Sequence, residues 1–534
     1  MLVESILPKP PPQAFKRQCY ALSRTRPPVK QFMQNATRLA AVDLGSNSFR
    51  LEIGHVDHGQ YLRSEYLKET VRQGGGLDEN RNLTPAAMQR GLECLARFGE
   101  RLAGFKSTEV RAVATQTLRE ARNRDDFLRQ ANKVLGFPID VISGREEARL
   151  IYQGVAQLLL PSNERRLVLD IGGRSTELIL GQGMEATVME SYRVGSIAWS
   201  SRYFPQGQFT ANAFQMAEIA AKAVLDEALN SLQKDTWDVA YGSAGTVGAV
   251  GDVLAAAGWP AGSVSREGLD WMLHTLLQAH SADRLHVVGM KEDRRPIIGG
   301  GLSILRAVFD LLQIDHLKLA SGGLRHGLIC DLMGNQPDQT NLPAISIKRL
   351  ATRFAVDAAQ AARVARVATY FFAQVQAIQP DSSEADRRAA LRKLDWAAQL
   401  HEIGIQISHS DYHKHGAYIL ENADVVGLVL SQLHRLSMLV LGHRGKLRKL
   451  EVNFDDEVFI LQLMCLRLAV ILCHARRDPD TDGLRLSVDA SKPQEVTLAC
   501  RRGWAQSYPQ SAHLLNEEVV AWQKTRWSFN LTDV

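Results

Sequence analysis

Two short segments of the chain share one pattern of acidic, glycine and hydroxyl residues. The first spans residues 39–53 and the second residues 167–180; in each, an apolar run ends in Asp, a Gly-containing turn follows, and a second apolar run begins. Three pairs of positions match between the copies: Asp43 with Asp170, Gly45 with Gly172, and Ser48 with Ser175. Two apolar runs joined by a short Gly-containing turn predict a β-hairpin.

The matched residues suit the binding of a phosphate and a cation. Ionised carboxylates are costly to bury unless they are paired or bind a cation. Gly and Ser leave backbone N–H groups and hydroxyls free to meet phosphate oxygens. One such segment alone would indicate an ordinary Asp-Gly turn. Two matched copies 127 residues apart instead predict two phosphate loops that face each other across a cleft, each with an Asp for Mg²⁺.

A second candidate for chemistry is the pair of adjacent glutamates in the segment 139–149. Ser143 is a good helix N-cap, and Glu146 then lies at the third helical position, which predicts a capping box. Glu147 has no such role and projects about 100° further round the helix. Nearby acidic residues would raise the pKa of Glu147 toward the value that a general base needs. The structural alternative is another solvated first-turn Glu.

Further Gly-rich segments lie at residues 241–246 and 321–327. Taken in order, the motifs resemble those of the exopolyphosphatase/guanosine pentaphosphate phosphohydrolase (Ppx/GppA) family, from about residue 39 to near the C-terminus. The resemblance implies that Glu147 is the general base and that Arg119 clamps a phosphate. The implied phosphate-binding residues are Ser46, Asn47, Ser48, Gly173, Ser175, Thr176 and Gly245, and the implied Mg²⁺ ligands are Asp43, Asp170 and Glu177.

Two positions depart from the family pattern. Arg174 stands where many members have a third Gly, and it would either add a phosphate contact or crowd the loop. His326 replaces the Glu that often follows the Arg at position 325. The chain has no GxxxxGK[ST] motif, which excludes a Walker-A ATPase.

The resemblance also implies the fold class: α/β, with two actin-like (ribonuclease H-like) ATPase-superfamily domains around a cleft. We expect a disordered, basic, Pro-rich tail at 1–37, actin-like domain I at 38–150, and actin-like domain II with a hinge helix at 151–339. An all-α HD-like domain is expected at 340–448 and a small α+β domain at 449–534. Within domain I, Thr84-Pro85 predicts a helix start and residues 110–114 predict a strand.

The expected helical domain contains the pair His401-Glu402 and several further histidines. The pair resembles the metal-binding His-Asp pair of HD phosphohydrolases, but its second residue is Glu and no His lies between His326 and His401. We therefore expect an HD-like domain without a working metal centre. Its basic residues would either line a path for a long polyphosphate or form an ordinary solvated face. In the last domain, three Trp (504, 522 and 527) indicate packing or a subunit interface.

The composition indicates a cytoplasmic protein. Six Cys are scattered without a CxxC motif, which argues against a disulfide scaffold or a zinc site. No signal peptide is visible, and the longest apolar run, 458–473, predicts a buried helix because it is short for a bilayer span. The first 38 residues hold seven Lys or Arg and one Glu, a net +6, which leaves −1 for the rest of a chain whose total is +5. We therefore expect no nucleic-acid partner; peripheral membrane contact is an open alternative that no residue pattern supports.

These residues predict an Mg²⁺-dependent hydrolase that releases the terminal phosphate of a phosphoanhydride chain. By resemblance, the expected substrate is inorganic polyphosphate, which would make the protein an exopolyphosphatase, and the expected assembly is a homodimer. The alternative in the same cleft is guanosine pentaphosphate (pppGpp), converted to ppGpp. A sugar or acetate-type kinase is disfavoured by Glu147, because a kinase must exclude water. A non-catalytic polyphosphate-binding protein is the remaining class, and it would not need Glu147.

Overall fold

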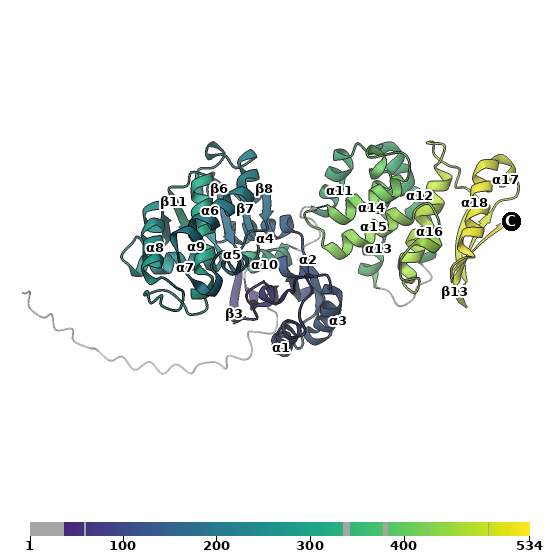
Figure 1. Ribbon diagram of the computed structural model, residues 1–534. Helices are drawn as coiled ribbons and strands as arrows, with labels where there is room; N and C mark the ends of the chain where they lie inside the picture. Colours follow the sequence, from purple (N-terminus) through teal and green to yellow (C-terminus); the bar gives the residue numbers. More distant parts are fainter. Residues whose placement is uncertain are drawn as a thin grey trace, which may run out of the picture.

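The computed structural model describes residues 37–57, 60–334, 342–376, 383–423, 425–489 and 491–533. The expected disordered tail, apart from its last residue, lies outside the described residues. Two bodies lie side by side (Figure 1): an α/β body that contains both expected actin-like domains, and a mainly helical body. We call the second body, residues 342–533, domain III.

Domain I is built on a five-stranded sheet. Its strands are β1 (Arg38–Leu44), β2 (Phe49–Asp57), β3 (Gln60–Glu69), β4 (Val110–Ala114) and β5 (Ile139–Val141), in the order β3-β2-β1-β4-β5. β1 and β2 form the first predicted hairpin, and β4 lies parallel to β1 over the predicted residues. The helices are α1 (Pro85–Arg101), α2 (Gln116–Glu120) and α3 (Arg124–Leu135). α1 begins as predicted, since the Thr84 hydroxyl accepts a hydrogen bond from the Ala87 N–H.

Domain II repeats this arrangement in a six-stranded sheet. Its strands are β6 (Arg165–Ile171), β7 (Thr176–Gln182), β8 (Glu185–Tyr192), β9 (Val239–Ser243), β10 (Ser263–Ser265) and β11 (His316–Leu319). The order β8-β7-β6-β9-β11, with β10 at the edge, matches β3-β2-β1-β4-β5 strand for strand. In both sheets three strands are antiparallel and the next two run parallel to the first. The sequence repeat therefore marks a duplicated sheet.

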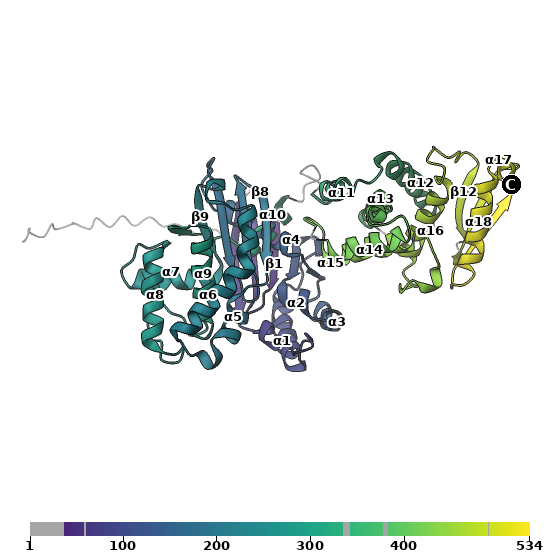
Figure 2. The same ribbon diagram turned by 45° about the horizontal axis from the view of Figure 1, so that its top comes forward.

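The main helices of domain II are α5 (Ser196–Tyr203), α6 (Ala211–Leu225), α7 (Ala244–Ala256), α8 (Arg266–Ala279) and α9 (Ile298–Leu311). In both ribbon views α7, α8 and α9 lie at the end of the α/β body that is remote from domain III (Figures 1 and 2). Their apolar residues, among them Val250, Met272 and Leu305, pack with Leu167 and Leu169 of β6 into one core.

Helices α4 (Gly144–Ala156) and α10 (Leu324–Gly334) join the two sheets. Leu150 of α4 and Leu328 of α10 pack on the first sheet, while Tyr152 of α4 packs on the second. The two helices cross so closely that a Cβ added to Gly327 would lie 2.0 Å from the Leu150 carbonyl oxygen. The expected hinge packing of α10 on domain I is therefore present, whereas the expected boundary at residue 150 falls inside α4.

Domain III has one continuous core. Its elements are α11 (Leu342–Arg353), α12 (Ala358–Gln376), α13 (Glu384–Leu400), α14 (Tyr412–Asn422), α15 (Leu430–Gly442), α16 (Glu457–Leu472), β12 (Leu484–Asp489), β13 (Lys492–Cys500), α17 (Trp504–Ser507), α18 (Pro509–Trp522) and β14 (Ser528–Asp533). Apolar side chains from Ile347 to Phe529 form a single cluster. The structure thus differs from the expected division at residue 448, because the buried helix α16 packs against both the helices and the small sheet. Trp504, Trp522 and Trp527 are buried in this core, so they serve packing.

The histidines of domain III do not form a metal cluster in the described residues. His401 and His443 are buried with ring centroids 5.6 Å apart, and the His401 Nδ1 lies 2.7 Å from the Ala398 carbonyl oxygen. Glu402 accepts a hydrogen bond from Arg476 at 2.7 Å. Both members of the His-Glu pair are thus engaged in internal contacts. Among the described helices, none is both long and apolar enough to cross a bilayer.

Candidate active site

The two hairpin turns meet at a cavity of about 300 Å³ between domains I and II. Ten of the twelve site residues expected from the sequence line it, which places both phosphate loops and the acidic residues around one volume. They are Asp43, Ser46, Asn47, Ser48, Glu147, Asp170, Gly173, Ser175, Glu177 and Gly245. The two turns have the same tight geometry: a Cβ added to Gly45 would lie 3.0 Å from the Ser48 carbonyl oxygen, and one added to Gly172 would lie 3.1 Å from that of Ser175.

The first hairpin carries a balanced charge pair. Asp43 lies opposite Arg50 in the β1–β2 register, and the Arg50 Nη1 donates to Asp43 Oδ2 at 3.2 Å. Arg325 of α10 approaches the same oxygen at 3.8 Å. Burial alone would lower the pKa of Arg50, but the Asp43 charge raises it overall, so this guanidinium stays charged.

The second hairpin carries two carboxylates at the equivalent positions. Asp170 lies opposite Glu177 in the β6–β7 register. Asp170 accepts a hydrogen bond from the Ser243 hydroxyl at 2.8 Å, and Glu177 accepts one from Ser191 at 2.8 Å. Burial raises the pKa of Asp170 to about 6, against the opposing Ser243 hydrogen bond. Burial and the charge of Glu147 raise the pKa of Glu177. This side of the cavity therefore has an excess of negative charge.

Glu147 lies in the first turn of α4 and lines the cavity. Burial raises its pKa, Arg119 opposes this shift, and the charges of Asp43 and Asp170 add to it. A buried carboxylate with a raised pKa is suited to accept a proton near neutral pH. The burial of Glu147 also excludes the alternative of a solvated first-turn residue.

Two expected phosphate contacts are absent from the cavity wall. Arg119 lies behind Glu147: its Nη1 donates to Glu147 Oε2 at 2.8 Å and to the Ile142 carbonyl at 2.9 Å. Gln116 holds the rest of the guanidinium through bonds of 2.7 and 3.0 Å. The Thr176 hydroxyl donates to the Val194 carbonyl at 2.6 Å. Arg119 thus orients the expected base in this structure, and Thr176 ties the second hairpin to a neighbouring segment.

The two departures from the family pattern have different surroundings. Arg174 reaches across the cleft from the second hairpin and donates to Glu120 at 2.5 Å and to the Gly74 carbonyl at 2.9 Å. It therefore joins domain II to domain I rather than crowding its loop. His326 lines the cavity 4.0 Å from Glu52, and burial lowers its pKa although the Glu52 charge opposes this.

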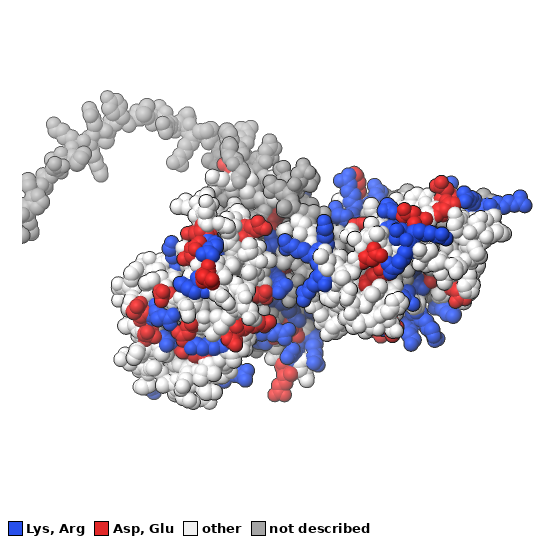
Figure 3. Space-filling model, turned by 90° about the horizontal axis from the view of Figure 1, so that it is seen from above, with Lys and Arg blue, Asp and Glu red and all other residues white. Residues whose placement is uncertain are grey.

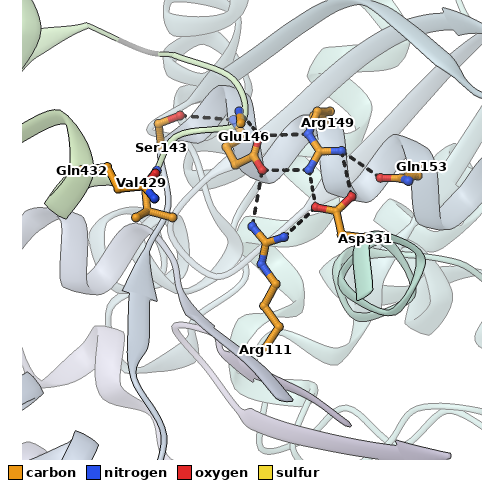
Figure 4. Close-up of polar contacts among 9 residues, drawn as sticks. Arg111, Ser143, Glu146, Arg149, Gln153, Asp331, Val429 and Gln432 are labelled. Carbon is orange, nitrogen blue, oxygen red and sulfur yellow. Dashed lines mark hydrogen bonds and ion pairs between the residues drawn. The ribbon is translucent and has the colours of Figure 1, made fainter. Parts of the chain in front are cut away.

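Glu146 does not complete the predicted capping box. The Ser143 hydroxyl accepts from the Glu146 N–H at 3.2 Å, as a cap should, but the Glu146 carboxylate is engaged elsewhere. It accepts two hydrogen bonds from Arg149, at 2.8 and 2.9 Å, and one from the Gly427 N–H of domain III at 2.8 Å (Figure 4). Long-range contacts have displaced the local one.

Sequence reasoning assigned no site role to three arginines in the cavity wall: Arg50, Arg294 and Arg325. Arg294 lies so close to Gly245 that a Cβ there would be 2.2 Å from its Nη2, so Gly245 makes room for a guanidinium. Arg50 follows Asp43 by seven residues on a hairpin, and Arg325 stands in the Gly-rich segment 321–327, so both had a signal in the sequence. On the surface, by contrast, Lys and Arg are interspersed with Asp and Glu over the face seen in Figure 3. The three arginines supply positive charge for an anionic ligand inside the cleft itself.

A second cavity, of about 310 Å³, adjoins the first and shares Asn47 with it. Its walls are mixed: Ile197, Phe204 and Ile297 are apolar, whereas Arg72 and Asp293 are charged. Asp293 also accepts a hydrogen bond from Lys68 at 2.9 Å. A cavity with apolar walls and a few polar groups is typical of small-molecule binding.

Comparisons with known proteins find the family that the sequence motifs resemble. The sequence model of the Ppx/GppA phosphatase family matches residues 56–336, and that of Ppx/GppA phosphatase domain III matches residues 344–519. The guanosine-5'-triphosphate,3'-diphosphate pyrophosphatase of Vibrio atlanticus is 36% identical over 497 residues, covering 92% of this chain and 97% of that protein.

Solved structures share the fold of the α/β body. An exopolyphosphatase from Cytophaga hutchinsonii superposes with a TM-score of 0.50 at 23% identity, over 56% of this chain and 98% of its own. An exopolyphosphatase-like protein superposes with a TM-score of 0.50 at 24% identity, over 55% of this chain and 97% of its own. These two structures correspond to little more than half of the chain.

Proposed function

The chain belongs to the Ppx/GppA phosphatase family, and we propose that its substrate is pppGpp, cut to ppGpp and orthophosphate with the help of Mg²⁺. As a member of this family it is a hydrolase of phosphoric anhydride bonds. The observation that carries the substrate proposal is the 36% identity, over 92% of the chain, to a protein named for pppGpp. Inorganic polyphosphate, the substrate expected from the motifs, remains the competing one.

The proposed reaction begins at Glu147. Its carboxylate accepts a proton from a water molecule, and the water oxygen attacks the terminal phosphorus. The bond between that phosphorus and its bridging oxygen breaks, so that orthophosphate and ppGpp leave. Ser48 and Ser175, one on each hairpin turn, would hold the terminal phosphate, while Arg50, Arg294 and Arg325 would offset its charge.

The second hairpin fits a cation. Asp170 and Glu177 are buried carboxylates with raised pKa values and no salt bridge within the described residues. No three His, Cys, Asp or Glu side chains in that part of the chain converge on one point. Mg²⁺ is commonly bound by one or two carboxylates, with water and phosphate oxygens completing its shell. When bound, it would neutralise charge on the phosphates. Asp43, the third ligand expected from the sequence, lies on the opposite hairpin and is paired with Arg50 instead.

The second cavity supports a nucleoside-containing substrate. It opens beside Asn47, so a nucleotide whose terminal phosphate lies between the hairpins could extend its base toward Ile197 and Phe204. A guanine base presents N–H donors, which the Asp293 carboxylate could accept. A chain of phosphates alone has no group that would use these apolar walls.

The test is phosphate release by the purified protein with Mg²⁺, comparing pppGpp and long-chain polyphosphate at equal terminal-phosphate concentration. We expect faster turnover of pppGpp. We also expect Asp293→Asn to raise KM for pppGpp while leaving KM for polyphosphate unchanged. Faster turnover of polyphosphate would make the protein an exopolyphosphatase. Release from neither substrate would contradict hydrolysis altogether.

A further inference from the structure

Domain III contacts the α/β body next to the proposed base. Residues 427–430, which we call the docking segment, precede and begin α15. Val429 forms an antiparallel bridge with Ile142, the residue that follows β5. The Gly427 N–H donates to Glu146 Oε2 at 2.8 Å. In Figure 2, α15 extends from the helical body toward α4. The docking segment therefore touches the short stretch, residues 142–147, that ends at Glu147.

Apolar contacts accompany these polar ones. Val429 is buried in one cluster with Ile142, Leu150 of α4 and Leu328 of α10. Leu430 packs against the core of domain I. Gly427 has φ +82°, and a Cβ there would lie 3.1 Å from the Pro343 nitrogen, so this loop shape depends on glycine. The docking segment thus has a loop conformation that requires glycine, and it contacts the α/β body through buried apolar side chains.

Glu146 connects the docking segment to an ion cluster in which Glu146 and Arg149 are buried and Arg111 and Asp331 are half-buried (Figure 4). Arg149 donates to Glu146 and also to Asp331 of α10 at 2.7 Å. Arg111 of β4 donates to Asp331 at 2.7 Å and lies 3.8 Å from Glu146. Two guanidiniums face two carboxylates, so the cluster is balanced in charge. Removing one member of such a cluster leaves a buried charge without its partner, which makes its geometry costly to change.

The stretch 142–147 also contacts the arginine that is hydrogen-bonded to Glu147. The Ile142 carbonyl accepts from Arg119 at 2.9 Å, and Arg119 donates to Glu147 at 2.8 Å. Ile142 therefore contacts Val429 and also the arginine that orients Glu147. Glu146 contacts Gly427 and is the neighbour of Glu147 in the first turn of α4. Two separate connections lead from the docking segment to the base.

Solved relatives have this α/β fold without a domain III. The two solved relatives correspond to 55–56% of this chain and to 97–98% of their own chains, about the share of this chain that domains I and II make up. The docking segment therefore belongs to a part of this chain that these relatives lack.

We propose that domain III positions the base: the docking segment fixes the stretch 142–147, with Glu146 as the positioning residue, and thereby holds Glu147 at its reacting distance from water. This inference rests on the proposed function only in taking Glu147 as the base. A displacement of a reacting group by about 1 Å can cost as much as roughly 10²-fold in rate.

The test compares Val429→Asp, which places a carboxylate in the apolar contact, with Val520→Asp at an exposed site of α18 as control. We expect Val429→Asp to lower kcat for pppGpp roughly 10-fold or more while KM stays within about twofold, because the phosphate loops are not touched. The acid limb of the kcat–pH profile should also move to lower pH, because water that reaches Glu147 lowers the pKa that burial had raised. Val429→Ile keeps the contact apolar and should therefore have the kcat, KM and kcat–pH profile of the wild type.

Hydrogen exchange of the amides of residues 143–147 is measured on the same proteins, and faster exchange is expected in Val429→Asp only. Gly427→Ala, which strains the loop more mildly, serves if Val429→Asp does not fold. Faster exchange with unchanged kcat and an unchanged pH profile would overturn the inference, and so would exchange that does not change. If the wild-type protein releases no phosphate from any phosphoanhydride, the proposed function fails, and the exchange result still decides whether the docking segment fixes this stretch.

Discussion

The two hairpins at the cleft share a turn but differ in charge. In the first, Asp43 faces Arg50 across the strand pair; in the second, the equivalent partner of Asp170 is Glu177. The turns themselves match, because Gly45 and Gly172 make the same close approach to a carbonyl oxygen three residues on. The two hairpins therefore have the same backbone, but the carboxylate on one side of the cavity is paired with an arginine, whereas the two carboxylates on the other side have no cationic partner in the described residues.

This difference indicates a division of labour. A carboxylate that is already paired with a guanidinium is stabilised little by a bound cation. Two neighbouring buried carboxylates repel each other when ionised, and a bound cation removes this repulsion. Under the proposed function, the first hairpin would bring Arg50 to the phosphates, and the second hairpin would hold Mg²⁺. The predictions that follow test this difference between the hairpins.

The largest effect is expected at Glu147, which senses the charges of Asp43 and Asp170 but lies on neither hairpin. Glu147→Gln keeps the size of the side chain and removes the proton acceptor, so kcat for phosphate release should fall by roughly 10²–10⁴-fold. Binding of pppGpp, measured by calorimetry, should survive. Glu185→Gln, at an exposed site of β8, is the matched control. Activity within about tenfold of wild type would refute the assignment of the base.

The next effect is on stability, and it should have opposite signs for the two hairpins. Asp43→Asn leaves Arg50 without its carboxylate and Arg325 with Glu52 alone. It should destabilise the protein by roughly 2 kcal/mol, less than the loss of a fully buried pair because Arg50 is partly exposed. Asp170→Asn removes a buried charge and should stabilise the Mg²⁺-free protein by roughly 1–3 kcal/mol at pH 7. Urea unfolding in EDTA measures both. If both substitutions change the free energy of unfolding in the same direction, the proposed difference in charge between the hairpins is wrong.

The pH dependence should report the second hairpin. Burial raises the pKa of Glu147, Glu177 and Asp170, the last to about 6, so their ionised forms appear only as the pH rises toward neutrality. Phosphate release should therefore increase with pH over this range. Because Mg²⁺ favours the ionised carboxylates, raising its concentration should move the acid limb to lower pH by about one unit. If the acid limb stays at the same pH at every Mg²⁺ concentration, no cation binds at Asp170 and Glu177.

The smallest effect is expected at Arg174, which occupies the position in the second turn that Asn47 has in the first. Arg174→Gln loses a partly exposed ion pair with Glu120, so the free energy of unfolding should fall by about 1 kcal/mol or less. KM for pppGpp should change by less than about threefold, since the guanidinium is held by Glu120 and Gly74. Thermal unfolding and steady-state kinetics measure these changes. A rise of KM by more than about tenfold would instead make Arg174 a phosphate ligand.

Local signals in the sequence were enough for much of the fold and site. The hairpins, the Thr84 cap and the strand 110–114 depend on neighbouring residues, and the structure has them where they were predicted. The loop residues reach one cavity because the duplicated sheets bring equivalent turns together.

Distant partners account for the rest. Glu146 was predicted to cap its own helix, but Gly427, which is 281 residues away, accounts for one of its hydrogen bonds. Arg119 was predicted to clamp phosphate and instead donates to Glu147 and Ile142. Arg294 enters the cavity beside Gly245 only through the packing of domain II. None of these contacts has a signature in the local sequence.

The central claim, that the cleft hydrolyses the terminal phosphoanhydride of pppGpp, is tested most directly in H₂¹⁸O. The protein is incubated with pppGpp and Mg²⁺, and the products are separated and analysed by mass spectrometry. We predict equal amounts of ppGpp and orthophosphate, with the ¹⁸O label in the orthophosphate, because water attacks the terminal phosphorus. Release of pyrophosphate, label in the guanosine product, or intact pppGpp would contradict the account.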